Sequence, residues 1–202
     1  DLMLALQLPG GPMAWDRKAW SWKLPESRAR ELKNFRVGYV FDDPFAPVTA
    51  EQRPLFEAVL EVLRKSGARL VPGWPTRYEQ AKLMETYDFM LQAFFATQMP
   101  QAQLVAERER RAKDPSPGAR GIRSTFTEWQ SEDRRRLEQR TLWQAYFQDV
   151  DVFLMPVAFC TAMAHDHSEP QSARRIATAS GPRPYDDLIK WIGAATLTGC
   201  PA

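Results

Sequence analysis

The fold of this chain is indicated first by a short stretch, FRVGYVF, at residues 35–41. Large apolar side chains stand at every second position, and Arg36 and Gly38 lie among them. A period of two is typical of a β-strand, because successive side chains of a strand point to opposite faces. The sequence Asp42-Asp43-Pro44 then interrupts the pattern. We therefore predict a strand at residues 35–41.

A helix and a second strand are predicted to follow. Thr49 and Gln52 have the spacing of a capping box, and Pro54 favours a helix start one or two residues later. Ser66-Gly67 fits a helix C-terminus, and residues 69–71 form a second short strand. The apolar face of the helix comprises Leu55, Phe56, Val59, Leu60 and Leu63. Residues 35–71 therefore predict a βαβ unit, whose crossover should be right-handed.

Helices are predicted for most of residues 76–148. Pro75-Thr76 with Glu79 forms a second capping signature. The helix after it carries an apolar stripe of Ala81, Met84, Tyr87, Leu91 and Phe94. Pro100 separates this helix from a charged one that ends near Lys113.

The rest of the chain alternates between polar and apolar segments. The Pro- and Gly-rich residues 114–121 predict a loop, and residues 125–148 predict a long helix. The apolar run at residues 150–155 predicts a buried strand that Pro156 ends. After a polar stretch, residues 185–197 predict one apolar helix closed by glycine and proline. The class is α/β, with more helices than strands.

Composition sets the class of protein. The 202 residues are 44% hydrophobic and carry 27 basic and 25 acidic side chains, for a net charge of +2. Basic clusters are interleaved with glutamates and aspartates, so we expect no nucleic-acid partner. No apolar run approaches the roughly 20 residues that span a bilayer, so we expect no membrane partner either. Two cysteines and no secretory signal favour the cytoplasm.

Local chemistry alone does not assign a function. His165-Asp166-His167 contains the only two histidines, and it reads either as a metal-binding or general-base segment or as a hydrogen-bonded turn. A zinc site needs a third or fourth ligand, so the turn is favoured. Cys160 lies five residues before His165, but a free cysteine is more often a small buried hydrophobe than a nucleophile. Phosphate loops, Cys-x-x-Cys pairs and Gly-x-Ser-x-Gly elbows do not occur.

Three stretches in a fixed order carry a family resemblance. They are DLMLAL at 1–6 with GGP at 10–12, VDVFLMPVA at 150–158 with Ala162 and HDHS at 165–168, and AATLTGCPA at 194–202. Together they resemble the amidase signature family, and the middle stretch is similar to a strand and loop of one bacterial subgroup. RVGY at 36–39 also resembles the strand that opens the family's variable region.

The resemblance implies an amidase-signature-like α/β fold, in which helices pack on a mixed sheet and only some strands lie in this chain. Residues 1–202 would be an internal or C-terminal-half fragment of one amidase domain. Within it, residues 35–71 would form the βαβ unit, residues 76–148 a helical variable region, and residues 150–202 the strand, loop and helix on the pocket side.

The resemblance also implies carboxamide hydrolysis, to a carboxylate and ammonia, by a Ser-Ser-Lys triad that needs no cofactor and no metal. No two serines are adjacent in the sequence, so no catalytic residue can be assigned within it. We expect the triad upstream of Asp1 and expect these residues alone to be inactive.

The same resemblance implies a wall of a substrate pocket. The expected substrate-binding residues are Pro156, Val157, Phe159, Cys160, His165, Asp166, His167 and Trp191. Phe159 and Thr161 stand where the subgroup has prolines, which predicts a less rigid loop. The expected partner is a small-molecule amide, and homodimerisation is left open. Two alternatives are an amidotransferase subunit of the same family and a non-catalytic binding or structural module.

Overall fold

The computed structural model describes residues 2–8 and 10–202, and the chain divides into units of residues 1–31 and 32–202. The first unit contains α1 (Leu2–Gln7) and irregular chain after it. Gly10 has no room for a Cβ because the Trp22 ring lies against it. Asp1, which opens the first family-like stretch, lies outside the described residues.

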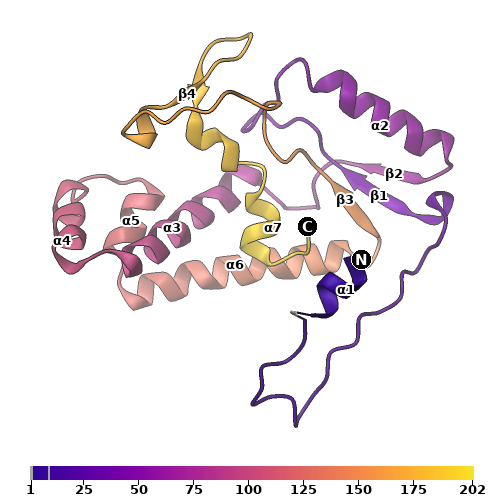
Figure 1. The fold of residues 1–202 in the computed structure, drawn as a ribbon, viewed down its shortest axis with the longest axis horizontal. Coiled ribbons are helices and arrows are strands. Elements are labelled where there is room, and N and C mark those ends of the chain that lie inside the picture. The colour runs from indigo at the N-terminus through magenta and orange to yellow at the C-terminus, as the bar shows by residue number, and fades with distance from the viewer. Residues whose placement is uncertain (1, 9) are drawn as a thin grey trace. The chain divides into compact units, whose positions relative to one another are not determined.

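The second unit is built on a three-stranded parallel sheet, shown in Figure 1. Its strands are β1 (Arg36–Tyr39), β2 (Arg69–Pro72) and β3 (Val152–Leu154), in the order β2-β1-β3. Val37 at the centre pairs with Leu70 on one side and Val152 on the other. The strand predictions at residues 35–41 and 69–71, and the parallel pairing expected of a βαβ unit, are therefore confirmed.

Residues 150–155 contain a strand as predicted, but the prediction that this strand is buried is wrong. Val150 is buried, but β3 itself is only partly covered and Val152 is 38% exposed. The reason is its place in the sheet, since β3 pairs with β1 and forms an edge of the strands that the structure describes. One face of β1 is closely covered, because a Cβ on Gly38 would overlap the Tyr146 hydroxyl.

The helix α2 (Arg53–Lys65) connects β1 to β2, but the predicted capping box at its start is wrong. Gln52 is the N-cap residue and makes no side-chain capping bond, and Pro54 lies in the first turn. The Thr49 backbone N–H instead donates to the Phe159 carbonyl oxygen at 2.8 Å. Thr49 therefore ties the β1–α2 loop to the loop after β3. The helix end at Ser66 is as predicted.

Helix α3 (Gln80–Gln98) starts later than Thr76, so the second capping signature is also wrong. Its N-cap Glu79 makes no side-chain capping bond, and a turn closed by Tyr78 N–H and Pro75 O precedes it. Gln80 is the first residue of α3, and its buried side chain bonds to the Tyr78 hydroxyl and to the Lys190 carbonyl oxygen. Pro100 separates α3 from α4 (Gln101–Arg110), as predicted.

The loop predicted at residues 114–121 is largely a helix, α5 (Pro117–Arg123). Ser116 accepts a hydrogen bond from the Ala119 N–H and caps the helix, and Pro117 fits its first turn. The glycines allow close packing on α3, because a Cβ on Gly121 would overlap the Phe89 carbonyl oxygen. The Pro-Gly composition thus serves a buried helix contact.

The long helix predicted at residues 125–148 is confirmed as α6 (Phe126–Tyr146). Thr125 and Glu128 form a complete capping box at its start. Buried Glu132, in the middle of the helix, is bonded by Thr86, Arg120 and Arg135. Figure 1 shows α3 to α6 gathered in a helical group, with α4 and α5 at its end farthest from the sheet.

The single helix predicted at residues 185–197 is split into η3 (Tyr185–Ile189) and α7 (Gly193–Thr198). The Lys190 carbonyl accepts from the Gln80 side chain, and Trp191 is fully buried between the two pieces. Before them lie η2 (Gln171–Ala173) and a small antiparallel pair, β4 (Arg175–Ile176) and β5 (Arg183–Pro184). A further short 3-10 turn, η1 (Leu32–Asn34), precedes β1.

Candidate functional site

The three parallel strands end at one edge of the sheet, which is where ligands bind in open α/β sheets. After β1, Asp43 accepts a 2.8 Å hydrogen bond from the Trp74 indole, which follows β2. The Trp74 ring stacks on Phe153 of β3, with centroids 5.4 Å apart. Aromatic packing and one carboxylate therefore join the ends of all three strands and hold the loop after β3 in place.

That loop forms much of a cavity of about 340 Å³, which we term the loop cavity. Its lining combines the loop with the β1–α2 connection and the β4–β5 region. The lining residues are Glu51, Cys160, Thr161, Ala162, Met163, Ala164, His165, Asp166, Arg175, Ile176, Ala177 and Tyr185. A cavity of this size suits a small organic molecule.

Titratable groups in the loop cavity do not assemble a nucleophile. Burial raises the pKa of the Cys160 thiol, with a further rise from the charge of Glu51 against a lowering by Arg183. Hydrogen bonds from the Ser168 hydroxyl and N–H lower the pKa of Asp166. A protonated thiol and an ionised carboxylate engaged by Ser168 favour binding over covalent chemistry.

The His165-Asp166-His167 segment adopts the predicted hydrogen-bonded turn, in which the Asp166 carboxylate accepts from the N–H and hydroxyl of Ser168. The rings of His165 and His167 stack at 5.8 Å, and both residues are exposed. Across residues 2–8 and 10–202, no group of three or more His, Cys, Asp or Glu side chains is placed to hold a metal ion.

A second cavity, of about 610 Å³, lies on β3 and is termed the strand cavity. It is lined by β3 and Met155, by Trp143 and Phe147, and by residues around α7. Pro156 and Val157 belong to its lining, and the Val157 side chain is 78% exposed. Its largely apolar lining suits the hydrocarbon part of a ligand.

Phe159 and Trp191 line neither of these two cavities. Both are fully buried, and they pack in one apolar cluster with Val40, Ala46, Val48 and Ile176. The Arg183 guanidinium lies 3.7 Å from the Phe159 ring centroid, and Trp191 stacks on Trp74 at 6.0 Å. These two aromatic residues anchor the loop from within the core.

The residues expected to bind substrate are therefore divided among four surroundings, of which the buried core holds Phe159 and Trp191. Cys160, His165 and Asp166 line the loop cavity, Pro156 and Val157 line the strand cavity, and His167 is exposed beside His165. Sequence reasoning missed Glu51, Arg175 and Tyr185 of the loop cavity, and also Asp43 and Trp74. The acidic pair Asp42-Asp43 directly after a strand was an available signal for the sheet edge.

The parallel sheet and the helices around it place the chain in the α/β class. Two cavities lie beside the segment that follows β3. The chain belongs to the amidase family, whose model, described as Amidase, matches residues 1–202. Its structure is similar to the crystal structure of a bacterial aryl acylamidase belonging to the amidase signature enzymes family, with a TM-score of 0.55. Sequence identity is 17%, so this likeness shows the fold alone.

The structural match covers 86% of this chain and 37% of the aryl acylamidase chain. This chain thus spans 37% of the length of that enzyme. No curated protein matches the sequence. Within the described residues, no helix is long and apolar enough to cross a membrane.

Proposed function

We propose that this chain forms the substrate-side part of an amidase that hydrolyses a carboxamide to a carboxylate and ammonia. The observation that carries the proposal is the match of the amidase family to all of residues 1–202. The amidase-signature fold of the structural relative supports it independently of the sequence motifs.

The chemistry is proposed to be an acyl-enzyme mechanism of a Ser-Ser-Lys triad. A serine attacks the amide carbonyl, a second serine and a neutral lysine carry the proton, and ammonia leaves before water releases the carboxylate. The sequence holds no adjacent serines, so we place the triad upstream of Asp1 in the protein. Residues 1–202 alone are then inactive, and the mechanism requires no cofactor.

The contribution of this chain is substrate binding by the segment from Pro156 to His167. This segment passes from the strand cavity to the loop cavity, and its middle is fixed by buried Phe159. A change in either cavity alters the surface offered to the acyl or amine part of an amide. The proposed setting is the cytoplasm, on the basis of two free cysteines.

The test is amide hydrolysis by purified protein, measured as ammonia released from simple carboxamides and as arylamine released from aryl acylamides. A protein containing this chain and the upstream triad should hydrolyse simple carboxamides and aryl acylamides, the latter included because the solved relative is an aryl acylamidase. Residues 1–202 expressed alone should release none. Activity of residues 1–202 alone would contradict the upstream placement of the triad, and inactivity of the longer protein on every amide would favour a non-catalytic module.

A further inference from the structure

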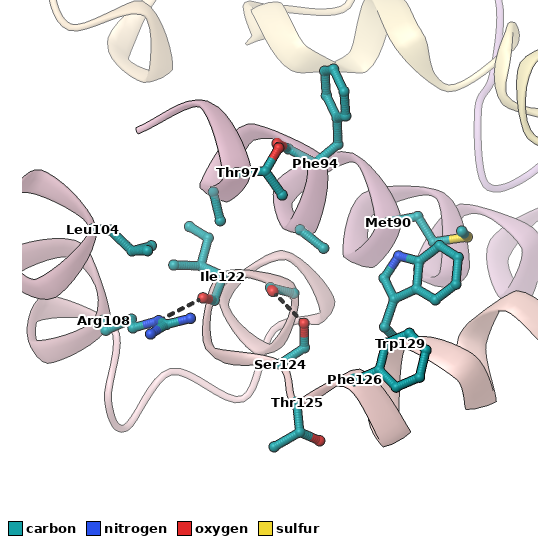
Figure 2. Close-up of a pocket in the computed structure, with 13 residues that line it drawn as sticks. Met90, Phe94, Thr97, Leu104, Arg108, Ile122, Ser124, Thr125, Phe126 and Trp129 are labelled. Carbon is teal, nitrogen blue, oxygen red and sulfur yellow. Dashed lines mark hydrogen bonds between the residues drawn. The ribbon is translucent and has the colours of Figure 1, made fainter. Parts of the chain in front are cut away.

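A third cavity lies in the helical group, apart from the loop and strand cavities, and is termed the helical cavity. It has a volume of about 620 Å³ and is formed by α3, α4, α5 and the start of α6. Figure 2 shows Ile122 near its centre, Leu104 and Arg108 on one side, and Phe126 and Trp129 on the other. None of the family-like stretches contributes to it.

The cavity is hollow because small residues form its floor. Ala93 and Ala96 of α3 and Gly121 of α5 are all buried, and Gly121 lets the two helices approach closely. Larger side chains at these positions would fill the space. The buried Ile122 side chain completes an apolar floor.

The rim carries large apolar side chains exposed to solvent. Phe94 is 58% exposed and Phe126 is 72% exposed. The rings of Phe126 and Trp129 are nearly parallel, 6° apart in plane, with centroids separated by 6.4 Å. Aromatic faces arranged around an apolar floor provide binding surface for a flat or branched hydrocarbon group.

Arg108 supplies the only charged side chain in the lining of this cavity. Its Nε donates to the Ile122 carbonyl oxygen at 3.1 Å, a bond that holds the guanidinium over the cavity. The neighbouring arginines differ, because Arg110 and Arg111 both pair with Glu107. In the part of the chain that the structure describes, Arg108 has no carboxylate partner.

We propose that the helical cavity binds an aromatic or branched-alkyl carboxylate. The carboxylate pairs with the terminal guanidinium nitrogens of Arg108, and the hydrocarbon part contacts Ile122 and the rim. Charge complementarity selects an anion, since an arginine fork matches a carboxylate in two parallel hydrogen bonds. The apolar lining selects a hydrophobic anion over a hydrated one such as phosphate. The site is separate from the reaction proposed above.

The experiment is calorimetric titration of the purified protein with 3-phenylpropanoate and with its neutral analogue 3-phenylpropan-1-ol. The acid should bind, and the alcohol should bind at least about tenfold more weakly, because it cannot form the charge-assisted pair. Arg108→Met should reduce binding of the acid by about tenfold or more and leave the alcohol unchanged. Raising the salt concentration should weaken the binding of the acid and leave the binding of the alcohol unchanged.

Two further variants locate the binding. Thr97→Trp places a large ring at the cavity and should abolish binding of both compounds. Arg110→Met removes a charge from the same helix outside the cavity, so it should leave binding intact. Arg108→Lys keeps the positive charge, so it should retain part of the affinity for the acid. Thermal melting and circular dichroism establish that each variant is folded.

The proposal is overturned by three results. The first is no measurable binding of 3-phenylpropanoate to the protein. The second is equal binding in Arg108→Met and the unmodified protein, which would place the acid elsewhere, for example in an amidase reaction pocket. The third is an equal loss in Arg108→Met and Arg110→Met, which would indicate a general charge effect.

Discussion

The indole N–H of Trp74 donates a 2.8 Å hydrogen bond to the Asp43 carboxylate. This bond joins the segments that follow β1 and β2, and the other carboxylate oxygen of Asp43 accepts from the Phe45 N–H at 2.8 Å. Trp74 in turn stacks on Trp191 and Phe153. One acidic side chain therefore links the segments after β1 and β2 at the edge of the sheet where the loop after β3 begins.

Replacing Asp43 should destabilise this edge. Asp43→Ala removes the acceptor of two N–H groups, and we expect a loss of about 1–3 kcal/mol in the free energy of unfolding. Trp74→Phe keeps most of the ring packing and the bond from Phe45, so its loss should be smaller. Urea denaturation followed by tryptophan fluorescence and circular dichroism measures both. An Asp43→Ala variant as stable as the parent would show that the contact is unimportant.

A second prediction concerns the contact between α5 and α3. Gly121→Ala would drive a Cβ into the rigid Phe89 carbonyl, so we expect a loss of about 1–3 kcal/mol or more. Gly118→Ala in the same helix is the matched control. Its Cβ would meet the Asp88 carboxylate at 2.7 Å, which is the movable end of a side chain. Thermal melts should show a clearly lower Tm for Gly121→Ala, and equal values would contradict the packing account.

The same helix shows where prediction from sequence stops. Proline and glycine at residues 117–121 favour a loop by local preference, and the sequence does not reveal that α3 lies close enough to require glycine. By contrast, the βαβ unit was predictable because its alternation and its helical face are local patterns. The starts of α2 and α3 were not, since Thr49 and Gln80 bond to residues more than 100 positions away.

The candidate site was predictable in the same partial way. Family-like motifs located the segment from Pro156 to His167, which does border two cavities. The motifs did not distinguish the buried residues Phe159 and Trp191 from the residues that line the cavities. The burial of these two depends on Trp74 and Arg183, which come from distant segments. Exposure of a side chain is decided by tertiary packing, which residue type and position in a motif do not specify.

The buried carboxylate of α6 gives a third prediction. Glu132 is 4% exposed and is bonded by Thr86, Arg120 and Arg135. Glu132→Ala leaves the buried Thr86 hydroxyl without this acceptor, so the expected loss is about 1–3 kcal/mol. Arg135→Ala should cost less than about 1 kcal/mol, because the Arg135 side chain is largely exposed. Chemical denaturation of the two variants tests the difference, and a larger loss from Arg135→Ala would refute it.

The fourth prediction follows from the Cys160 thiol, whose pKa is raised chiefly by burial, with a lowering by the charge of Arg183 and a smaller rise from that of Glu51. A raised pKa leaves less thiolate at neutral pH, so alkylation by iodoacetamide should be slower than in the unfolded chain and should accelerate only at higher pH. Removing a negative charge stabilises the thiolate. Glu51→Gln should therefore lower the pKa of Cys160 and speed its alkylation at a fixed pH.

Mass spectrometry of a Cys200→Ser background isolates the single remaining thiol. Glu79→Gln is the control, because Glu79 pairs with Lys82 and is not among the charges that act on Cys160. Alkylation of Cys160 as fast as in the unfolded chain would disprove the shielding of the thiol.

The last prediction tests whether the loop cavity contributes to substrate choice. Ala162 is exposed and lines this cavity, so Ala162→Trp places a large ring in a space of about 340 Å³ without disturbing the core. In the protein with its triad, we expect KM for a bulky amide to rise by about tenfold or more, since obstructing a pocket removes substrate binding without touching the reacting groups. The smallest amide, acetamide, should be affected least, and kcat should change little.

Ala102→Trp is the matched control, because Ala102 is exposed on α4 and lines none of the three cavities. Steady-state kinetics over a series of amides of increasing size measures the effect, with thermal melts to establish folding. An unchanged KM across the series would remove the loop cavity from substrate recognition and leave the strand cavity as the remaining candidate. An equal fall in kcat for every amide would instead indicate that the loop positions the catalytic groups.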